Sequence, residues 1–273
     1  VILPSKLDAH EWESKTAVAV KAFQNRRVKS MDQLQKPLQI GVLSWLKVAS
    51  SSKKTDETNE TTMFMRRAQE PFAEGQVRIA YQGQLARQKR GLEDAGKSAV
   101  VLKSFKHHGS GVNDRRQYLK QMEISNIAHF LAQVYNDSED CPAHCAQIRV
   151  LKNCVVEEDD DSKEAHGSRR FCVEDPLPEG TSFVKFSNNT GHWDEDHLDE
   201  TLLRFTQFTY EASKGYLMVT DLQGVKKGNS FILTDPVILC TDILRFGGTN
   251  LGETFMKKCI GSTREYLNEN GWH

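Results

Sequence analysis

Two β-strands followed by a long helix form the part of this sequence that most restricts its fold. Residues 77–85 and 99–105 have strand character, and the polar, glycine-bearing segment 88–97 between them predicts a hairpin. Apolar residues then recur at helical spacing and predict a helix over roughly 114–136: Leu119, Met122, Ile127, Phe130, Leu131 and Val134. We expect the apolar face of this helix to pack on the hairpin.

Helices and short strands alternate in the second half of the chain. Residues 216–220 and 230–233 are predicted to be strands that flank a polar turn, and helical spacing resumes after the glycine-bearing loop 246–252. Another helix, ending near Gly215, is predicted by four apolar residues at helical spacing: Leu198, Leu202, Phe205 and Phe208. Strands that dominate first and mix with helices later predict an α+β protein with two lobes.

The composition is that of an ordinary globular protein. A net charge of −1 gives no reason to expect nucleic-acid or membrane binding, and no apolar run approaches the roughly 20 residues of a membrane helix. Six cysteines in 273 residues favour a reducing compartment, so we expect a cytoplasmic protein. The chain begins at Val1 rather than Met, which is compatible with a fragment of a longer protein.

Three further segments leave a functional and a plain interpretation open. The basic stretch 17–31 could bind a calmodulin-like regulator, although a surface strand or helix is favoured. The acidic run 157–161 could attract basic substrates, although a solvated loop is favoured. Cys141, His144 and Cys145 could supply half a metal site, although a loop with free thiols is favoured because no second Cys/His cluster follows at zinc-finger distance.

Charged residues near strand ends could carry chemistry. Lys103 lies in an otherwise apolar strand and is expected to send its ammonium out of the core at one edge, where a cation could meet nucleotide phosphates. Asp221 and Asp235 each follow an apolar strand, so their carboxylates could share one cleft, with Gln223 as a further oxygen ligand for Mg²⁺. A snorkelling lysine and two turn-forming aspartates remain the alternatives.

Two polar segments could bind the phosphates or help to close the site. Residues 247–252 could cradle an anion through backbone N–H groups, but Glu253 and Thr254 stand where a Walker A loop has Lys and Ser/Thr. Residues 185–191 combine a lysine with two asparagines. A turn before a helix and an Asx-rich turn are the alternatives without function.

In their order along the chain, these segments resemble the alpha-kinases, a family of atypical protein kinases. The resemblance runs from Pro71 to Gly252 and rests on motifs that are modest singly and specific as a series: 71–81, 101–105, 185–191, 208–210, 221–225, 233–236 and 246–252. It implies the two-lobed atypical protein kinase (alpha-kinase) fold, with an extension of unclear structure over 1–37, an N-lobe from 38 to about 174 and a C-lobe over 175–273. It also implies an ATP-dependent serine/threonine protein kinase that transfers the γ-phosphate to a protein hydroxyl.

The resemblance further implies roles for single residues. Lys103 and Arg78 would hold the ATP phosphates, and Glu174 would face the adenine at the hinge. Gln223 and Asp235 would bind Mg²⁺. The other members of the nucleotide site would be Lys185, Asn189, Gly247 and Gly252, and the catalytic residues would be Asp221, Asp235, Lys103 and Asn250. By analogy with other kinases, Glu123 on the predicted helix would pair with Lys103.

One departure from the family pattern concerns zinc. The family has a structural zinc site of two His and two Cys in the C-lobe, but Gln207, Lys257 and Thr263 stand at three of those positions here. Cys259 alone remains, and one thiolate cannot supply the four ligands of a structural zinc, so none is expected there. This loss leaves an alternative function open: a catalytically weak pseudokinase that acts as a nucleotide-binding or scaffolding domain.

Overall fold

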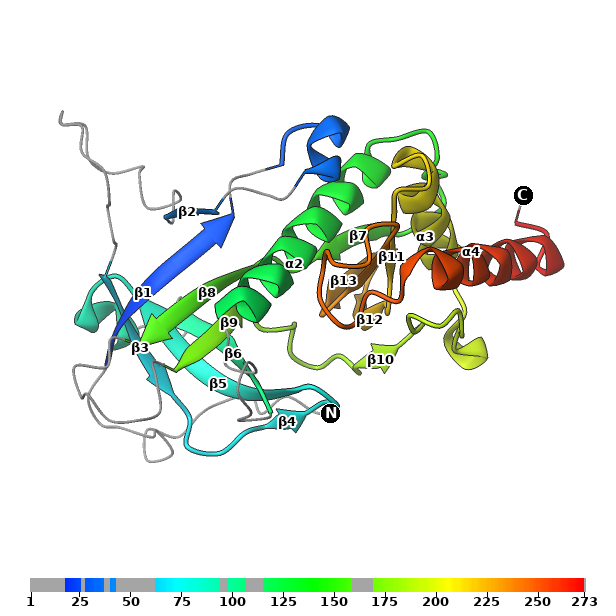
Figure 1. Cartoon of the computed structure of the whole chain (residues 1–273). Helices are drawn as coiled ribbons and strands as arrows, with labels where there is room; N and C mark the ends of the chain where they lie inside the picture. Colours follow the sequence, from blue (N-terminus) through cyan, green and yellow to red (C-terminus); the bar gives the residue numbers. More distant parts are fainter. Residues whose placement is uncertain are drawn as a thin grey trace.

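A computed structural model describes residues 18–25, 28–36, 40–42, 62–93, 98–106, 115–158 and 169–272. Two groups of elements lie on either side of a long central helix (Figure 1). An eight-stranded sheet forms one lobe, and two smaller sheets with two helices form the other. The α+β class and the two lobes predicted from the sequence are confirmed.

The N-lobe sheet closes on itself, because β1 pairs with β3 on one side and with β8 on the other. Strands β5 and β6 form the predicted antiparallel hairpin, with Ala80 opposite Lys103. The interior of the closed sheet is filled by apolar residues that include Val20, Leu102 and Phe171. The strands of this sheet are β1 (Val18–Asn25), β2 (Ile40–Val42), β3 (Thr62–Arg67), β4 (Ala73–Glu74), β5 (Arg78–Ala86), β6 (Ala99–Phe105), β8 (Asn153–Glu158) and β9 (Arg170–Glu174). The short 3-10 helix η4 (Lys89–Glu93) lies between β5 and β6.

The long central helix is α2 (Arg115–Asn136), within one residue of the prediction. It packs mainly on β7, β8 and β9 rather than on the hairpin, so that expectation was wrong. The reason is that β9 pairs with β6 and β8 pairs with β9, which puts these two strands under the helix. Contact with the hairpin includes an edge-to-face packing of Tyr118 on Phe105. Within the described part of the chain, no helix is both long and apolar enough to cross a membrane.

The C-lobe contains two small sheets, and their pairing differs from the prediction. The strands predicted at 216–220 and 230–233 do not pair with each other: β11 pairs with β14, and β13 lies between β12 and β7. Strands β12 and β14 were not predicted, and β12 occupies part of what was predicted to be a polar turn. The elements are β7 (Gln147–Val150), β10 (Val184–Lys185), β11 (Leu217–Thr220), β12 (Gln223–Lys227), β13 (Ser230–Thr234), β14 (Val237–Cys240), η5 (Glu195–His197), α3 (Glu200–Ala212) and α4 (Gly252–Glu269).

Strand β7 belongs to the C-lobe sheet although it precedes residue 174. It pairs in parallel with β13, and Ile148 lies opposite Phe231. Both side chains are buried in the C-lobe core together with residues of α2 and α3. The boundary predicted near 174 therefore does not separate the two lobes by a single cut of the chain.

Two segments with open interpretations take plain structural roles. Residues 18–25, predicted to lie in an extension, form β1, in which Val20 and Ala22 are buried. Met31–Gln35 form the short 3-10 helix η2. Ala17, Arg26 and Arg27 lie outside the described residues. Glu157 and Glu158 are the last residues of β8 and pair with arginines, so the prediction of a solvated loop was wrong for these two residues. Asp159–Asp161 lie outside the described residues.

Candidate active site between the lobes

Arg78, Lys103 and Glu174 project from one face of the N-lobe sheet. Lys103 on β6 lies opposite Ala80, two residues after Arg78 on β5. Glu174 on β9 lies opposite Val101, two residues before Lys103. Since side chains alternate between the two faces of a strand, offsets of two residues place all three on the same face as diagonal neighbours.

The ammonium of Lys103 is buried between the two lobes and fully engaged. Its Nζ lies 2.5 Å from Glu174 Oε1 and 2.9 Å from Asp235 Oδ1, and it donates to Thr234 Oγ1 at 2.8 Å. The Thr234 hydroxyl donates in turn to the Glu174 carboxylate at 2.7 Å. The side chain of Lys103 is only 8% exposed, so the predicted exit of the ammonium at a strand edge was wrong.

Glu123, the partner predicted for Lys103, lies elsewhere. Its carboxylate pairs with Arg245 at 2.7 Å, and Glu174 takes the place beside the lysine. The reason is that β9 lies next to β6 in the sheet, which puts Glu174 directly beside Lys103. Thr234, which joins the lysine to this glutamate, is a site residue that the sequence analysis missed.

Burial and neighbouring charges act against each other in this cluster. Burial alone would lower the pKa of Lys103, but Asp235 and Glu174 raise it above its ordinary value. Burial raises the pKa of Glu174, and Lys103 only partly offsets the effect. Burial also acts on Asp235, yet Arg78 and Lys103 together hold the pKa of this carboxyl below its usual range. Lys103 and Asp235 are thus held in their charged forms.

One buried ion pair is poorly aligned. Arg78 Nη1 lies 3.0 Å from Asp235 Oδ1 without a well-aligned hydrogen bond, and the same oxygen also lies 2.9 Å from Lys103 Nζ. Buried polar atoms without such a bond are costly, and a ligand can satisfy them. A carboxylate oxygen suits a hard cation and a guanidinium suits phosphate oxygens, so the pair fits a metal–polyphosphate ligand.

Asp221 follows β11 and Asp235 follows β13, which lie in different sheets. The two residues are brought together by β12, which begins two residues after Asp221 and pairs with β13, with Gln223 opposite Thr234. Both aspartates have left-handed backbone conformations, with φ of 56° at Asp221 and 52° at Asp235, which aspartate tolerates better than most residues. The Gln223 amide spans them: its Nε2 donates to Asp221 Oδ2 at 3.3 Å and to the Asp235 carbonyl at 3.2 Å. The structure thus brings Asp221, Gln223 and Asp235 together.

Lys185 supplies the counter-charge of Asp221. Its Nζ lies 2.8 Å from Asp221 Oδ1, and its side chain is 53% exposed, so this pair faces the solvent side of the site. Burial raises the pKa of Asp221, and the hydrogen bond from Lys185 opposes the rise. A carboxylate whose pKa is raised in this way is a stronger proton acceptor than an exposed one.

Gly224 allows β12 to run close to β13 directly behind Gln223. Its φ is 151°, and a Cβ at this position would lie 2.1 Å from the Ile232 carbonyl oxygen. No side chain fits there. The Leu222 N–H on the other side of Gln223 donates to Ser187 Oγ at 3.0 Å, which fixes the chain between the two carboxylates. Ser187 is a second residue that the sequence analysis missed.

Asn250 organises the glycine-bearing loop. Its Nδ2 donates to the carbonyls of Asp242 and Arg245, each at 2.9 Å, and its Oδ1 accepts from the N–H groups of Cys240 at 2.9 Å and Gly252 at 3.0 Å. The amide has no further hydrogen-bonding capacity, and the side chain is buried. This geometry does not fit the predicted catalytic role for Asn250 and favours a positioning role.

The asparagines of 185–191 serve different purposes. Asn188 Oδ1 accepts from the N–H groups of Thr190 at 2.9 Å and His192 at 3.1 Å, which is the Asx-rich turn considered above. Asn189 Nδ2 donates to the Thr249 carbonyl at 2.9 Å and joins this turn to the glycine-bearing loop. Gly247 and Gly252 in that loop have φ of 82° and 78°. Asn189 therefore contacts the loop that was predicted to cradle an anion.

Arg245 holds the same loop from its other side. Its guanidinium donates to the Leu34 and Lys36 carbonyls and to the Tyr216 hydroxyl, and it pairs with Glu123 on α2. The side chain is 5% exposed. Leu34 of η2, Glu123 of α2 and Tyr216 just before β11 thus contact the arginine that precedes Phe246, where the loop turns with φ of 68°.

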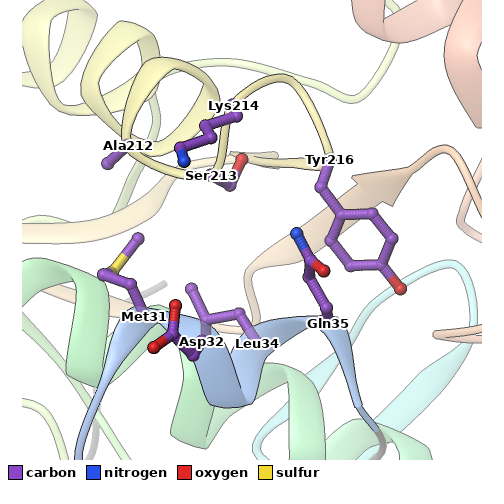
Figure 2. A pocket seen from close by; sticks show the side chains of 8 residues that line it. All are labelled: Met31, Asp32, Leu34, Gln35, Ala212, Ser213, Lys214 and Tyr216. Carbon is purple, nitrogen blue, oxygen red and sulfur yellow. The ribbon is translucent and has the colours of Figure 1, made fainter.

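A separate small cavity has Leu34 and Tyr216, two of the residues that Arg245 contacts, in its lining (Figure 2). Its volume is about 130 Å³, less than the roughly 300 Å³ at which small-molecule sites begin. It lies between η2 and the end of α3 and is lined by Met31, Asp32, Leu34, Gln35, Ala212, Ser213, Lys214 and Tyr216. None of these residues belongs to the charged cluster around Lys103.

The positions of the family's zinc ligands have other contacts here. Gln207 Nε2 donates to Glu211 at 2.9 Å, and Lys257 pairs with Glu253 at 2.7 Å. Cys259 and Thr263 are buried. Within the described residues, no group of three His, Cys, Asp or Glu side chains converges at Cys259.

Comparison with known proteins identifies relatives of one kind. Residues 73–264 match the sequence profile of the alpha-kinase family. Alpha-protein kinase vwkA of Dictyostelium discoideum is 32% identical over 195 residues, 71% of this chain and 29% of its own length; myosin heavy chain kinase B of the same organism is 30% identical over 203 residues, 72% and 25% respectively. The chain thus spans less than a third of these relatives.

The fold is similar to that of a solved kinase domain. The alpha-kinase domain of myosin heavy chain kinase A, crystallised in complex with AMPPCP, superposes with a TM-score of 0.66. The match covers 91% of this chain and 92% of that one, at 21% sequence identity. The predicted alpha-kinase fold is confirmed.

Proposed function

Because the chain belongs to the alpha-kinase family, we propose that it is an ATP-dependent protein kinase domain that phosphorylates serine or threonine hydroxyls. The observation that supports this most is the buried group of Lys103, Arg78 and Asp235, whose misaligned pair would be satisfied by a metal–polyphosphate ligand. Arg78 would bind the ATP phosphates through charge-assisted hydrogen bonds, and Lys103 would do so by exchanging its contact with Asp235 for a phosphate oxygen.

Two oxygen-bearing residues are suited to Mg²⁺. Asp235 offers the carboxylate and Gln223 the amide oxygen, and hard cations prefer such ligands. When bound, Mg²⁺ would neutralise charge on the phosphates. The nearby Glu174 carboxylate is used by Lys103 and Thr234, so we propose that it orients the lysine; the adenine contact stays a prediction.

Asp221 is placed to act on the substrate hydroxyl. Its carboxylate lies on the solvent side of the cluster beside Lys185, and burial raises its pKa. It would orient the hydroxyl and accept its proton as the phosphoryl group is transferred, which is the role of an aspartate in other kinases. Asn189, Asn250 and the glycines 247 and 252 would hold the loop that faces the protein substrate.

A phosphorylation assay tests the proposal directly. The chain is incubated with γ-³²P-ATP, Mg²⁺ and a basic protein substrate, and acid hydrolysis then identifies the labelled amino acid. We expect phosphoserine or phosphothreonine with wild type, none with Asp221→Asn, and unchanged labelling with the exposed control Asp196→Asn. ATP binding without any labelling would identify the pseudokinase alternative, and equal labelling by Asp221→Asn would refute the assigned site.

A further inference from the structure

A second group of reactive side chains lies far from the charged cluster, where the loop after α2 meets the start of α3. His144 and Cys145 are on the loop, and Glu200 is the first residue of α3. His144 Nε2 lies 3.0 Å from Glu200 Oε2. The three ligand atoms of His144, Cys145 and Glu200 all lie within 4.8 Å of one another, and among the described residues no other such group of His, Cys, Asp and Glu is present.

We propose that His144, Cys145 and Glu200 bind one zinc ion, with a fourth position open to water. Zinc bonds of about 2.0–2.1 Å to nitrogen, 2.3 Å to sulfur and 2.0–2.2 Å to oxygen place tetrahedral ligand atoms roughly 3.3–3.6 Å apart. His144 Nε2 and Glu200 Oε2 are 3.0 Å apart and no pair of ligand atoms is more than 4.8 Å apart, so movements of about 1 Å would bring all three to zinc-bonding distance. The site is distinct from the family's zinc position at Cys259.

The set of donors favours zinc over the cations of the kinase reaction. An imidazole and a thiolate are borderline to soft ligands, which zinc accepts and Mg²⁺ avoids. The Cys145 thiol is buried. Zinc binds the thiolate, so binding releases the thiol proton to solvent and zinc affinity falls as the pH is lowered.

The surroundings hold two of the ligands in place. The second oxygen of Glu200 accepts from Arg204 Nε at 2.6 Å, which leaves Oε2 directed at His144. Next to Cys145, the Ala146 N–H donates to Thr201 Oγ1 at 3.0 Å, and the Cys145 N–H donates to the Pro142 carbonyl at 2.9 Å. Outer hydrogen bonds of this kind fix the orientation of metal ligands.

Metal titration of the whole chain tests the site without reference to kinase activity. Chelator-treated protein is titrated with Zn²⁺ in competition with a chromophoric chelator, and with Co²⁺ followed by absorbance. We expect one zinc per chain, and a Co²⁺ complex with the near-ultraviolet thiolate charge-transfer band. His144→Ala and Glu200→Gln should each weaken zinc about 100-fold or more, the upper end of the loss caused by removing even an outer partner.

Matched controls separate the site from adventitious binding. His197 is a half-exposed histidine whose Nδ1 lies 2.9 Å from Asp194, so His197→Ala removes an equivalent ion pair elsewhere and should leave zinc binding unchanged. Cys259→Ser should also leave it unchanged. His144 is 68% exposed, so its replacement does not endanger folding. Absence of stoichiometric zinc in wild type, or wild-type affinity in His144→Ala, would overturn the proposal.

Discussion

Replacing Lys103 by methionine removes the cation that lies between Glu174 and Asp235. Methionine keeps most of the apolar length of the side chain, so the change isolates the charge. Removing one partner of a buried pair costs about 3–5 kcal/mol, because the other charge is left uncompensated. For a domain of this size, about 2–4 °C is lost per kcal/mol, so we expect the melting temperature to fall by roughly 6–20 °C.

The stability lost in Lys103→Met should depend on pH, and Glu174 determines the direction. Burial already raises the pKa of Glu174, and loss of the ammonium raises it further. An acid whose pKa is higher in the native state than in the unfolded state binds its proton more tightly when the chain is folded. Its contribution to the free energy of unfolding is therefore most favourable below the unfolded pKa of about 4.3, and it is lost as the pH rises through the native pKa. Lys103→Met should therefore be closer to wild type at pH 5 than at pH 8.

A second substitution identifies the cause. Glu174→Gln removes the orphaned charge, so Lys103→Met/Glu174→Gln should melt above Lys103→Met, while neither variant transfers phosphate. Thermal melts and urea titrations of the two single variants and the double variant give the coupling. Lys257→Met, which removes an exposed partner of Glu253, is the control. A melting temperature for Lys103→Met within about 1 °C of wild type, or no recovery in the double variant, would refute the reasoning.

Three other substitutions have different expected signatures. Asp221→Asn should abolish transfer yet keep ATP affinity and the melting temperature at neutral pH, because burial already disfavours its charge; lost ATP affinity in calorimetry would contradict this. Asp235→Asn should weaken Mg²⁺-dependent ATP binding and lower stability, and the stability gap should close as the pH falls through the depressed pKa of Asp235 in wild type; a gap that widens in acid melts would contradict it. Gly224→Ala should cost about 3 kcal/mol or more in urea titrations, since its Cβ would overlap the Ile232 carbonyl; wild-type stability would contradict it.

Local patterns were enough to find the principal elements. The spacing of Met122, Ile127 and Leu131 placed α2 to within one residue, and the run of apolar residues in 99–105 placed β6. Both signals depend on residues a few positions apart, which is the range over which helices and strands impose their periods. Strand β12, with the sequence Gln-Gly-Val-Lys-Lys, was predicted to be part of a polar turn because a glycine and two lysines are typical of one.

Contacts between residues far apart in the sequence could not be predicted from local patterns. Nothing local indicates that Lys103 meets Glu174 and Thr234 rather than Glu123, because the choice depends on which strand lies next to β6. One signal was available for Thr234: a hydroxyl in the buried strand 230–234 needs a hydrogen-bond partner. For Asn250, the motif identified the residue, but only its four backbone contacts reveal what the amide does.

The parallel pairing of β7 with β13 has a consequence for synthesis of the chain. β7 is synthesised long before β13, the one strand that it pairs with among the described residues, so both edges of β7 stay unpaired until β13 is made. Unpaired edges of this kind invite association with other chains, and parallel pairing across a long separation is slow. A product that stops at residue 174 would leave β7 unpaired permanently, whereas a piece that begins at residue 175 would lack the strand that completes its own sheet.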